Sequence, residues 1–535
     1  MAEFDKHQGL EAIPEGLQEA GGILPGIAAK VAQETGNAEA HVYGVGSFYH
    51  LLSRPNAKVR VCTGLSCLMA GADKVLAATQ AAGWPSEGCS CLAGCDVAPA
   101  VLKDRRVLPK VQVEDIERAG ADWTAFEAAA DTSEDAWLGD FGPTESMPDK
   151  LAMNLAGAQD YSGAAFAHAR EMGAEAIVAQ LKESGLQGRG GAGFPAHFKW
   201  SSLRSQAETK RHVVLNADEG EPGTFKDREV MMRRPDLVLE GLAIAAQAVE
   251  ATDVWLYLRG EFELPKRAMR DALARFQEQD LFAGIEFHFH DGQGAYICGE
   301  ETALIEALEG KRGMPRLKPP FPTEAGLWGK PTLIHNVETI ACVPAILMRG
   351  GEWFHKLGRT EAGSKLYCIS GDVVRPGTYE LPLGINLDEL VEVAGGYVGE
   401  LKAFSPGGAS SGFLPASERQ RPLSYKALGE VGSMLGSAGV VVLNEKTDIR
   451  WAVMQQLRFF RDESCGQCAP CRIGTEYLHE SVKRDGSVND LTHVADAAWQ
   501  MNEGSICGLG QAAPLPLTSA LKYFPEEFEA PETNA

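Results

Sequence analysis

Residues 185–200 read GLQGRGGAGFPAHFKW, and their glycines decide how the central part of the chain folds. Gly188, Gly190 and Gly193 match G-x-G-x-x-G, the spacing of a dinucleotide-binding turn. Such a turn normally follows a strand and opens a helix. Here an amphipathic helix pattern comes directly before the glycines, and the first strand pattern comes only at 212–216. The stretch therefore predicts a phosphate-binding loop on a Rossmann-like sheet that is entered from a helix.

The sequence on either side of this loop divides into regions of different pattern. Helical and strand-like patterns alternate over 151–345, which predicts an α/β sheet domain. Residues 346–440 predict a small domain of short strands and turns around one helix, and 441–535 a mainly helical domain. Residues 1–125 carry helical patterns followed by the strand and helix order of a small α/β domain. The acidic stretch 126–150 has no apolar period and predicts a linker.

The composition is that of a multidomain globular protein. The formal charge of -23, from 73 acidic and 50 basic residues, argues against non-specific nucleic-acid binding, which requires a basic surface. No apolar stretch approaches the roughly 18 residues that span a bilayer. The N-terminus lacks the basic and apolar segments of a secretory signal. We therefore expect a cytoplasmic protein, in which the 12 cysteines do not form disulfides.

Three cysteines near the C-terminus have the spacing of an iron–sulfur site. Cys465, Cys468 and Cys471 form C-x2-C-x2-C, a pitch at which three thiolates can surround one [4Fe–4S] cluster. Cys507 is the candidate for the fourth ligand. Zinc is the alternative, because it also binds four cysteines, although zinc sites usually use paired C-x2-C knuckles. Plain buried thiols are the other alternative, and we expect the cluster.

A second cysteine group lies in the N-terminal domain. Cys62 and Cys67 form C-x4-C, and Cys91 and Cys95 form C-x3-C, so the two pairs can hold the two irons of a [2Fe–2S] centre. Cys89 makes the second pair ambiguous, and we expect it to be an unligated loop thiol. Zinc on the same pairs is the alternative. The scattered cysteines are expected to be small buried residues, and they are Cys298, Cys342 and Cys368.

Several motifs in order resemble the NADH-oxidising flavoprotein subunit of respiratory complex I and its relatives. They are GLQGRGGAGFPAHFKW (185–200), NADEGEPGTFKDRE (216–229), YLRGEF (257–262), GAYICGEETALIEALEG (294–310), KPPFP (318–322), and SCGQCAPCRIG (464–474) followed by SICGLGQ (505–511). Three N-terminal segments resemble the thioredoxin-like [2Fe–2S] subunit of the same module: VYGVGSFY (42–49), CTGLSC (62–67) and CLAGCDVAPAV (91–101). The resemblance covers nearly the whole chain outside the linker.

This resemblance implies an α/β multidomain fold with four parts. They are a thioredoxin-like [2Fe–2S] domain with N-terminal helices (1–125), a Rossmann-like FMN- and NADH-binding domain (151–345), a small β-grasp-like domain (346–440) with a scaffold role, and a C-terminal helical [4Fe–4S] domain (441–535).

The resemblance also implies a function. In complex I the two cluster-bearing parts are normally separate chains, and fused chains resemble the diaphorase subunits of soluble enzymes. We therefore expect the beta subunit of a cytoplasmic NAD-dependent formate dehydrogenase. The alternative is the diaphorase subunit of an NAD-linked or bifurcating hydrogenase, or of an NADH:quinone oxidoreductase. Hydrogenase subunits of this kind often carry further ferredoxin cysteines, and none follows Cys507.

Roles for individual residues follow from the same resemblance. Hydride passes between nicotinamide C4 and flavin N5, so no catalytic acid or base is expected, and Glu219 is expected to tune the flavin or nucleotide. The residues implied to bind FMN are Gly188, Gly190, Lys199, Asn216, Asp218, Glu219, Tyr296, Gly299, Glu300, Glu301, Asn336 and Thr339. Those implied to bind NADH are Phe194, Glu221, Lys318 and Phe321, the two phenylalanines by stacking around the adenine.

Two positions depart from the family pattern. His335 stands where asparagine is usual beside Asn336, so a phosphate hydrogen bond is not carried over there. Ser202 stands where some relatives have an aromatic residue, so one side of the adenine stack is not carried over. His288 and His290 alternate with apolar residues as in a strand, and metal binding there is the minor alternative.

The implied partners are a molybdenum or tungsten formate dehydrogenase alpha subunit and a small [2Fe–2S] gamma subunit. NAD+ or NADH is the expected substrate, and neither nucleic-acid binding nor membrane insertion is expected. Two hypotheses from other classes stay open: an iron–sulfur redox-sensing or assembly protein without nucleotide chemistry, and a zinc-stabilised binding scaffold. The glycine-rich and GEET motifs argue against the first of these.

Overall fold

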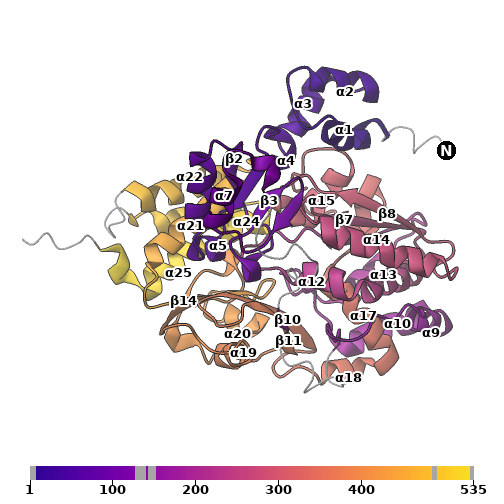
Figure 1. The fold of residues 1–535 in the computed structure, drawn as a ribbon. Helices are drawn as coiled ribbons and strands as arrows, with labels where there is room; N and C mark the ends of the chain where they lie inside the picture. The colour runs from indigo at the N-terminus through magenta and orange to yellow at the C-terminus, as the bar shows by residue number, and fades with distance from the viewer. Residues whose placement is uncertain (1–7, 127–139, 142–151, 485–490, 530–535) are drawn as a thin grey trace, which may run out of the picture.

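The computed structural model describes residues 8–126, 140–141, 152–484 and 491–529 (Figure 1). Within these residues the chain forms three β-sheets with helices packed on and between them. Most of the predicted linker, residues 127–139 and 142–151, lies outside the described residues. Its described part is β5 (Asp140–Phe141), which pairs in parallel with β11 (Gly377–Pro382) of a distant sheet.

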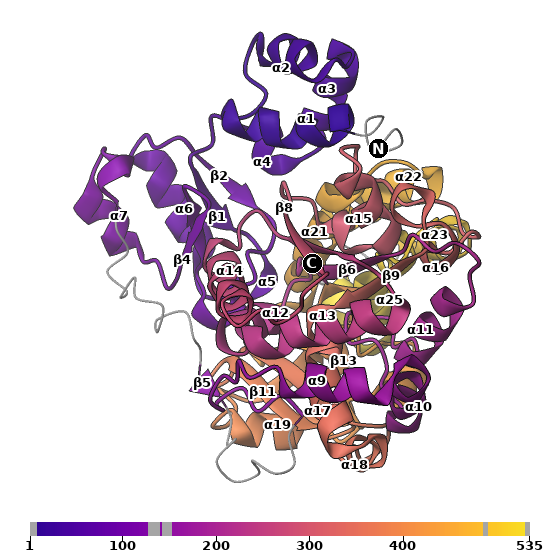
Figure 2. The ribbon, with the colours of Figure 1, turned by 90° about the vertical axis from the view of Figure 1, so that its right-hand side faces the viewer.

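The N-terminal region has a helical bundle and a separate four-stranded sheet (Figure 2). The bundle consists of α1 (Gln8–Glu19), α2 (Ile27–Thr35), α3 (Glu39–Gly46) and α4 (His50–Ser53). The sheet has the order β2-β1-β3-β4, with β1 (Val59–Cys62), β2 (Ser86–Cys89), β3 (Val101–Lys103) and β4 (Arg106–Leu108). Its helices are α5 (Leu65–Met69), α6 (Ala72–Ala81) and α7 (Val113–Ala119). Because β1 and β2 are parallel, the cysteine loops that follow them leave the same edge.

The central domain is built on a parallel four-stranded sheet of order β8-β7-β6-β9. Its strands are β6 (His212–Ala217), β7 (Asp253–Leu258), β8 (Glu286–Asp291) and β9 (Thr332–Asn336). The helices around it are α9 (Ala164–Met172), α10 (Ala174–Ser184), α11 (Ala196–Arg204), α12 (Lys226–Arg233), α13 (Pro235–Val249), α14 (Glu263–Gln277), α15 (Glu301–Leu308), α16 (Pro322–Ala325), α17 (Val337–Arg349) and α18 (Gly351–His355). Helix α13 is apolar on nearly every face and is correspondingly buried, as expected for a helix inside a large domain.

A six-stranded mixed sheet of order β13-β12-β14-β10-β11-β5 forms the next domain. Its strands besides β5 and β11 are β10 (Ser364–Gly371), β12 (Leu401–Ser405), β13 (Leu414–Pro415) and β14 (Gly439–Asn444). Helices α19 (Leu387–Val393) and α20 (Tyr425–Gly429) complete it. This domain matches the short strands and turns predicted between residues 346 and 440, with the added strand β5 supplied by the linker.

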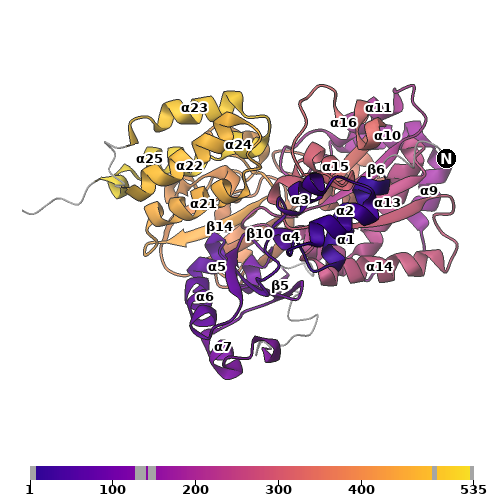
Figure 3. The same cartoon turned by 90° about the horizontal axis from the view of Figure 1, so that it is seen from above.

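The C-terminal region is helical, as predicted. It contains α21 (Ile449–Glu463), α22 (Ala469–Arg484), α23 (Val494–Gly504), α24 (Gly508–Ala512) and α25 (Leu515–Tyr523). Seen from above in Figure 3, these yellow helices lie at one end of the molecule and the parallel sheet with α13 and α14 at the other.

One apolar core joins segments that are far apart in the sequence. Leu17 of α1, Leu304 of α15 and Phe460 of α21 are all buried in the same cluster. Because this core is shared by three regions, the domains fix the loops between them in position. None of the helices in the described ranges is both long and apolar enough to cross a membrane.

Candidate functional site

The glycine loop lies between α10 and α11, with strand β6 further along the chain, as the sequence predicts. The loop closes on itself, because the Gly188 N–H donates to the Phe194 carbonyl at 2.8 Å. Tyr425 Oη, from the six-stranded sheet domain, donates to the Gly188 carbonyl at 3.0 Å. A Cβ at Gly190 would lie 3.1 Å from Cβ of Asn336, a tight contact that glycine avoids where the loop approaches the end of β9.

A cavity of about 490 Å³ opens beside this loop, at the carboxyl ends of β6 and β9. Ligands of open α/β sheets commonly bind at such strand ends. The predicted FMN and NADH residues that line the cavity are Gly190, Asn216, Asp218, Glu219, Glu221, Tyr296, Gly299, Glu300 and Asn336. The predicted residues outside its lining are Gly188, Phe194, Lys199, Glu301, Lys318, Phe321 and Thr339.

The acidic loop after β6 supplies one wall of the cavity. Glu219 accepts hydrogen bonds from the backbone N–H groups of Asp227 (2.8 Å) and Arg228 (3.1 Å) at the start of α12. Burial, with the nearby Asp227 charge, raises the pKa of Glu219 to about 8. Burial likewise raises the pKa of Asp218, whose Oδ2 has no hydrogen-bond partner among the described residues.

These features fit a flavin nucleotide. A buried carboxylate oxygen without a partner calls for a polar group of a ligand, because burying a polar atom without a hydrogen bond is costly. The glycine loop beside it leaves room where any side chain would crowd Asn336. The residues present thus offer both a backbone cradle for a phosphate and polar partners for a ring edge.

The structure adds lining residues that the sequence motifs did not single out. Lys226 is fully buried, and its Nζ lies 2.8 Å from Asp227 Oδ1, 3.0 Å from Glu338 Oε2 and 3.2 Å from Asn336 Oδ1. These carboxylates outweigh the effect of burial and raise the pKa of Lys226, so this lysine is a cation in the cavity wall. Its only sequence signal is its place in the motif NADEGEPGTFKDRE.

Two other domains complete the cavity. Gly407, Ser410, Met434, Gly436 and Ser437 come from the six-stranded sheet domain, and Asn502, Gly508, Leu509, Gln511, Ala512 and Leu515 from the C-terminal helices. The Ser410 N–H donates to Glu221 Oε1 at 2.8 Å, and Tyr296 Oη donates to Glu221 Oε2 at 2.5 Å. The β-grasp-like domain is therefore more than the scaffold that we expect from the sequence, because one of its loops lines the site.

The predicted NADH residues other than Glu221 lie outside the cavity lining. The side chains of Phe194 and Phe321 are about half exposed, at 45% and 51%. Lys318 Nζ lies 2.8 Å from Glu300 and 2.9 Å from Glu301, and Lys199 Nζ lies 2.8 Å from Glu301. Burial would raise the pKa of Glu301, but these two lysines lower it to about 2. Lys199 thus contacts Glu301 rather than lining the cavity.

The two departures from the family pattern have structural explanations. His335 faces away from the cavity and accepts a hydrogen bond on Nε2 from Trp200 Nε1 at 2.8 Å. Burial lowers the pKa of His335 to about 3, so the ring is neutral and serves the core. Ser202 Oγ lies 3.1 Å from Thr323 Oγ1, next to the segment that carries Phe321. Thr339 lies at the start of α17, and its Oγ1 accepts a hydrogen bond from the Arg189 N–H at 2.8 Å. This bond holds the glycine loop against α17.

The four C-terminal cysteines meet at the ends of helices. Cys465 and Cys468 follow α21, Cys471 lies in the first turn of α22, and Cys507 directly precedes α24. Burial raises the pKa of Cys471 to about 12, and the charges of the other three thiols contribute. Such a group of desolvated thiols is stable as thiolates only when a metal centre compensates their charge, which fits an iron–sulfur cluster.

The predicted [2Fe–2S] cysteines also come together. Cys91 Sγ lies 3.7 Å from Cys95 Sγ, and the Cys62 thiol interacts with those of Cys67 and Cys91. Cys89 pairs in register with Cys62 on the neighbouring strand and borders a separate polar cavity of about 360 Å³ between three domains.

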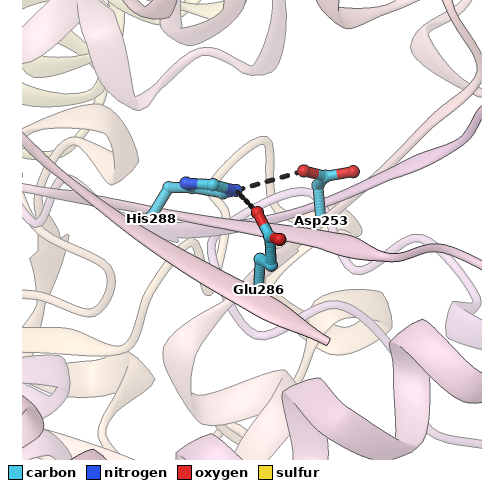
Figure 4. Close-up of side chains that lie close together, drawn as sticks. All are labelled: Asp253, Glu286 and His288. Atoms are coloured by element: carbon cyan, nitrogen blue, oxygen red, sulfur yellow. Dashed lines mark hydrogen bonds and ion pairs between the residues drawn. The ribbon is translucent and has the colours of Figure 1, made fainter. Parts of the chain in front are cut away.

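At the sheet edge, His288 lies beside two carboxylates, those of Asp253 and Glu286, as Figure 4 shows. His288 Nε2 lies 3.1 Å from Asp253 Oδ1 and 3.8 Å from Glu286 Oε2. Lys210 Nζ is 2.5 Å from Asp253 Oδ2, and the Trp255 ring stacks on the His288 ring at 4.2 Å. Since Lys210 already balances the Asp253 carboxylate, we interpret Asp253 and Glu286 as partners of Lys210 and His288 and not as metal ligands.

Comparison with protein families assigns a known module to each described domain. The thioredoxin-like [2Fe-2S] ferredoxin family matches residues 3–123, and the Nuo51 FMN-binding domain matches residues 181–345. The SLBB domain matches residues 366–414, and the NADH-ubiquinone oxidoreductase-F iron-sulfur binding region matches residues 451–531. The predicted fold class and the predicted cofactors FMN, NAD, [2Fe–2S] and [4Fe–4S] are thereby confirmed.

Relatives that match most of the chain are subunits of NADH-quinone oxidoreductases and of an NAD+-reducing hydrogenase. One of the F-type subunits of NADH-quinone oxidoreductase in Rhizobium meliloti is 47% identical over 370 residues, which cover 66% of this chain and 88% of that protein. The F-type NADH-quinone oxidoreductase subunit of Rickettsia typhi is 41% identical over 407 residues, covering 71% and 97%. A solved chain of an NAD+-reducing [NiFe]-hydrogenase in the H2-reduced state has a TM-score of 0.89 and 30% identity, and the alignment covers 98% of this chain and 95% of that one.

Proposed function

Because this chain belongs to the family of F-type NADH-quinone oxidoreductase subunits, we propose that it is the diaphorase subunit of a multisubunit NAD-dependent formate dehydrogenase. In this role it passes electrons between iron–sulfur clusters, FMN and NAD+ or NADH. The observation that carries the diaphorase role is the shared cavity, which the glycine loop, the acidic loop and the helices around Cys507 border together. Its location is proposed to be the cytoplasm.

Bound FMN would supply hydride chemistry towards NADH and one-electron chemistry towards the iron–sulfur clusters. The chain's own residues bind and orient it. Gly190 gives room for the phosphate, and Asn216 and Asp218 offer hydrogen bonds to the ring edge. Lys226 supplies a positive charge next to Asn336, and Glu219 stays neutral up to about its pKa of 8. The exposed rings of Phe194 and Phe321 offer stacking faces for the adenine of NADH.

The clusters are proposed to use Cys465, Cys468, Cys471 and Cys507 for [4Fe–4S], and Cys62, Cys67, Cys91 and Cys95 for [2Fe–2S]. Cysteine variants test this assignment directly. We expect Cys465→Ala to lose the [4Fe–4S] signal in electron paramagnetic resonance of the dithionite-reduced protein while FMN stays bound. Cys91→Ala should lose the [2Fe–2S] signal, and the matched Cys89→Ala should keep it. Survival of both signals in C465A, or loss of the [2Fe–2S] signal in C89A, would refute the ligand sets.

The donor subunit is proposed to be a molybdenum or tungsten formate dehydrogenase alpha subunit, with a small [2Fe–2S] gamma subunit as a further partner. The support is the fusion of both cluster domains in one chain, which resembles the diaphorase subunits of soluble enzymes. The second candidate is the diaphorase subunit of an NAD-linked hydrogenase. It is favoured by the match of a hydrogenase chain over 98% of this chain.

Two measurements test the proposed function: the first tests the diaphorase role, and the second distinguishes the formate dehydrogenase from the hydrogenase. The visible spectrum of the purified chain should show flavin bands near 450 nm (a general flavin property) that bleach with NADH, and their absence would overturn the diaphorase role. Affinity purification from the native host should then recover a molybdopterin protein and formate-dependent NAD+ reduction. Recovery of a nickel–iron protein with hydrogen-dependent NAD+ reduction would replace the formate proposal by the hydrogenase one.

A further inference from the structure

Three arginines from other domains form hydrogen bonds with the cysteine loops of the N-terminal sheet domain. Each donates a hydrogen bond to a backbone carbonyl at or beside a proposed [2Fe–2S] ligand. The contacts are Arg259 Nη2 to Cys91 O at 2.7 Å, Arg228 Nη1 to Ala93 O at 2.6 Å, and Arg458 Nη2 to Thr63 O at 2.9 Å. Ala93 lies between Cys91 and Cys95, and Thr63 directly follows Cys62.

Two of these arginines have their charge balanced inside the protein. Arg228 forms ion pairs with Asp96 at 2.7 Å and with Glu229 at 2.6 Å. Arg259 forms an ion pair with Glu261 at 3.0 Å. Both guanidinium groups therefore position the loop between Cys91 and Cys95, and each shares its charge with a neighbouring carboxylate.

Arg458 is different, because no carboxylate in the described part of the chain lies within ion-pair distance of it. It projects from the middle of α21, between the buried side chains of Leu457 and Phe459, which hold the helix in place. Burial lowers the pKa of Arg458, although Asp462 and the Cys62 thiol act in the opposite direction. An arginine keeps its proton at any working pH, so this is a fixed positive charge.

A cluster held by four thiolates becomes more negative by one charge when it takes up one electron. A fixed cation nearby therefore stabilises the reduced form more than the oxidised form and raises the reduction potential. Cys62, Cys67 and Cys91 are buried, which limits screening on the cluster side, whereas Arg458 is half-buried and borders the polar cavity of about 360 Å³.

We infer that Arg458 raises the reduction potential of the [2Fe–2S] centre, by holding a positive charge that has no direct ion-pair partner in the described part of the chain against the loop after Cys62. The inference rests on the proposed ligand set. It makes Arg458 a positioning and tuning residue: the helix that leads to the [4Fe–4S] cysteines also controls how readily the other cluster accepts an electron. Arg458 does not line the proposed flavin cavity.

The test is a potentiometric titration of the purified full-length protein with dithionite, followed by electron paramagnetic resonance of the [2Fe–2S] signal. We expect Arg458→Gln to shift the midpoint to a more negative value, and Arg458→Lys, which keeps the charge, to shift it less. Arg461→Gln is the matched control. Arg461 lies one turn further along α21, and its charge is already paired with Asp462 at 2.8 Å.

The outcomes are distinct. An R458Q midpoint equal to that of the unmodified protein, or equal shifts in R458Q and R461Q, would overturn the inference. So would loss of the [2Fe–2S] signal in both R458Q and R458K, because Arg458 would then be needed for assembly and not for tuning. A missing [2Fe–2S] signal in the unmodified protein would instead overturn the proposed ligand set. The [4Fe–4S] midpoint and the flavin content, read from the same samples, should not change.

Discussion

Ser90 Oγ donates a hydrogen bond to the carboxylate of Glu463, across 373 residues of sequence. Ser90 directly precedes Cys91, and Glu463 ends the helix that leads to Cys465. The same carboxylate accepts from the backbone N–H of Tyr296 at 3.0 Å, and Tyr296 lines the proposed flavin cavity. One buried side chain thus joins the two cysteine regions to the wall of the nucleotide site.

We predict that Glu463→Ala loosens this junction. The substitution leaves the half-buried Tyr296 N–H and Ser90 hydroxyl without their acceptor, and because an unsatisfied fully buried donor costs about 1–3 kcal/mol, the loss of stability should be at most about that size. The thermal unfolding midpoint of the loaded protein should therefore fall. Glu476→Ala is the control, because the Glu476 side chain is 58% exposed and its removal should change stability by less than about 0.5 kcal/mol. Equal midpoints for the two variants would contradict the role of Glu463.

Gly190→Ala should weaken FMN binding. The new Cβ would lie 3.1 Å from Cβ of Asn336, and overpacking of this kind costs about 1–3 kcal/mol, or roughly 5- to 150-fold in affinity. The ratio of flavin absorbance to protein in the purified variant measures the loss, while both iron–sulfur signals should persist. At Gly429 an added Cβ meets nothing within 4 Å, so Gly429→Ala should retain full flavin. Full flavin in G190A would show that the loop does not border the flavin.

Phe321→Ala should raise the KM for NADH without loss of flavin. Loss of one aromatic stacking partner is worth about 0.5–1.5 kcal/mol, which corresponds to roughly 2- to 12-fold. The rate of flavin bleaching at saturating NADH should stay within about twofold, because Phe321 lies outside the cavity lining. Val374→Ala, at a 56% exposed position in the six-stranded sheet domain, is the matched control. An unchanged KM in F321A would remove Phe321 from the NADH site.

His335 should make the protein sensitive to acid. Its pKa is lowered by burial to about 3 in the folded protein, against 6.5 as the ordinary value. Unfolding therefore takes up a proton at pH values between these two, so the stability from this group is present above pH 6.5 and lost as the pH falls towards 3. The slope is at most about 1.4 kcal/mol per pH unit.

The measurement is the free energy of unfolding, at pH 7 and at pH 5, of the protein purified with its FMN and iron–sulfur clusters bound. His335→Gln, whose amide oxygen can still accept from Trp200, should lose less stability on acidification than the unmodified protein. His493→Gln, at a position that is 78% exposed, should behave like the unmodified protein. The same pH dependence in H335Q and in the unmodified protein would mean that another group carries the proton.

The cysteine and glycine patterns illustrate what could be predicted from the sequence. The spacing of Cys465, Cys468 and Cys471 and the position of the glycine loop between two helices depend on near neighbours in the chain, and short-range geometry limits them strongly. The resemblance to a family added the cofactors, and the comparisons confirm them.

Other residues had little or no usable signal in the sequence. Ser410 looks like an ordinary polar residue, Lys226 is marked only by its place in the motif NADEGEPGTFKDRE, and His335 departs from the asparagine that is usual beside Asn336. In the structure Lys226 and Ser410 line the cavity, and His335 turns into the core because successive side chains of a strand point to opposite faces.

The sequence by itself therefore determined the kinds of site that this protein carries: two cysteine groups, a phosphate-binding glycine loop and an acidic loop. Only the tertiary structure decided how those sites are connected. Arg458 meets Thr63 and Glu463 meets Ser90 because domains hundreds of residues apart share one apolar core. Such contacts depend on the packing of whole domains, and no local pattern of residues encodes them.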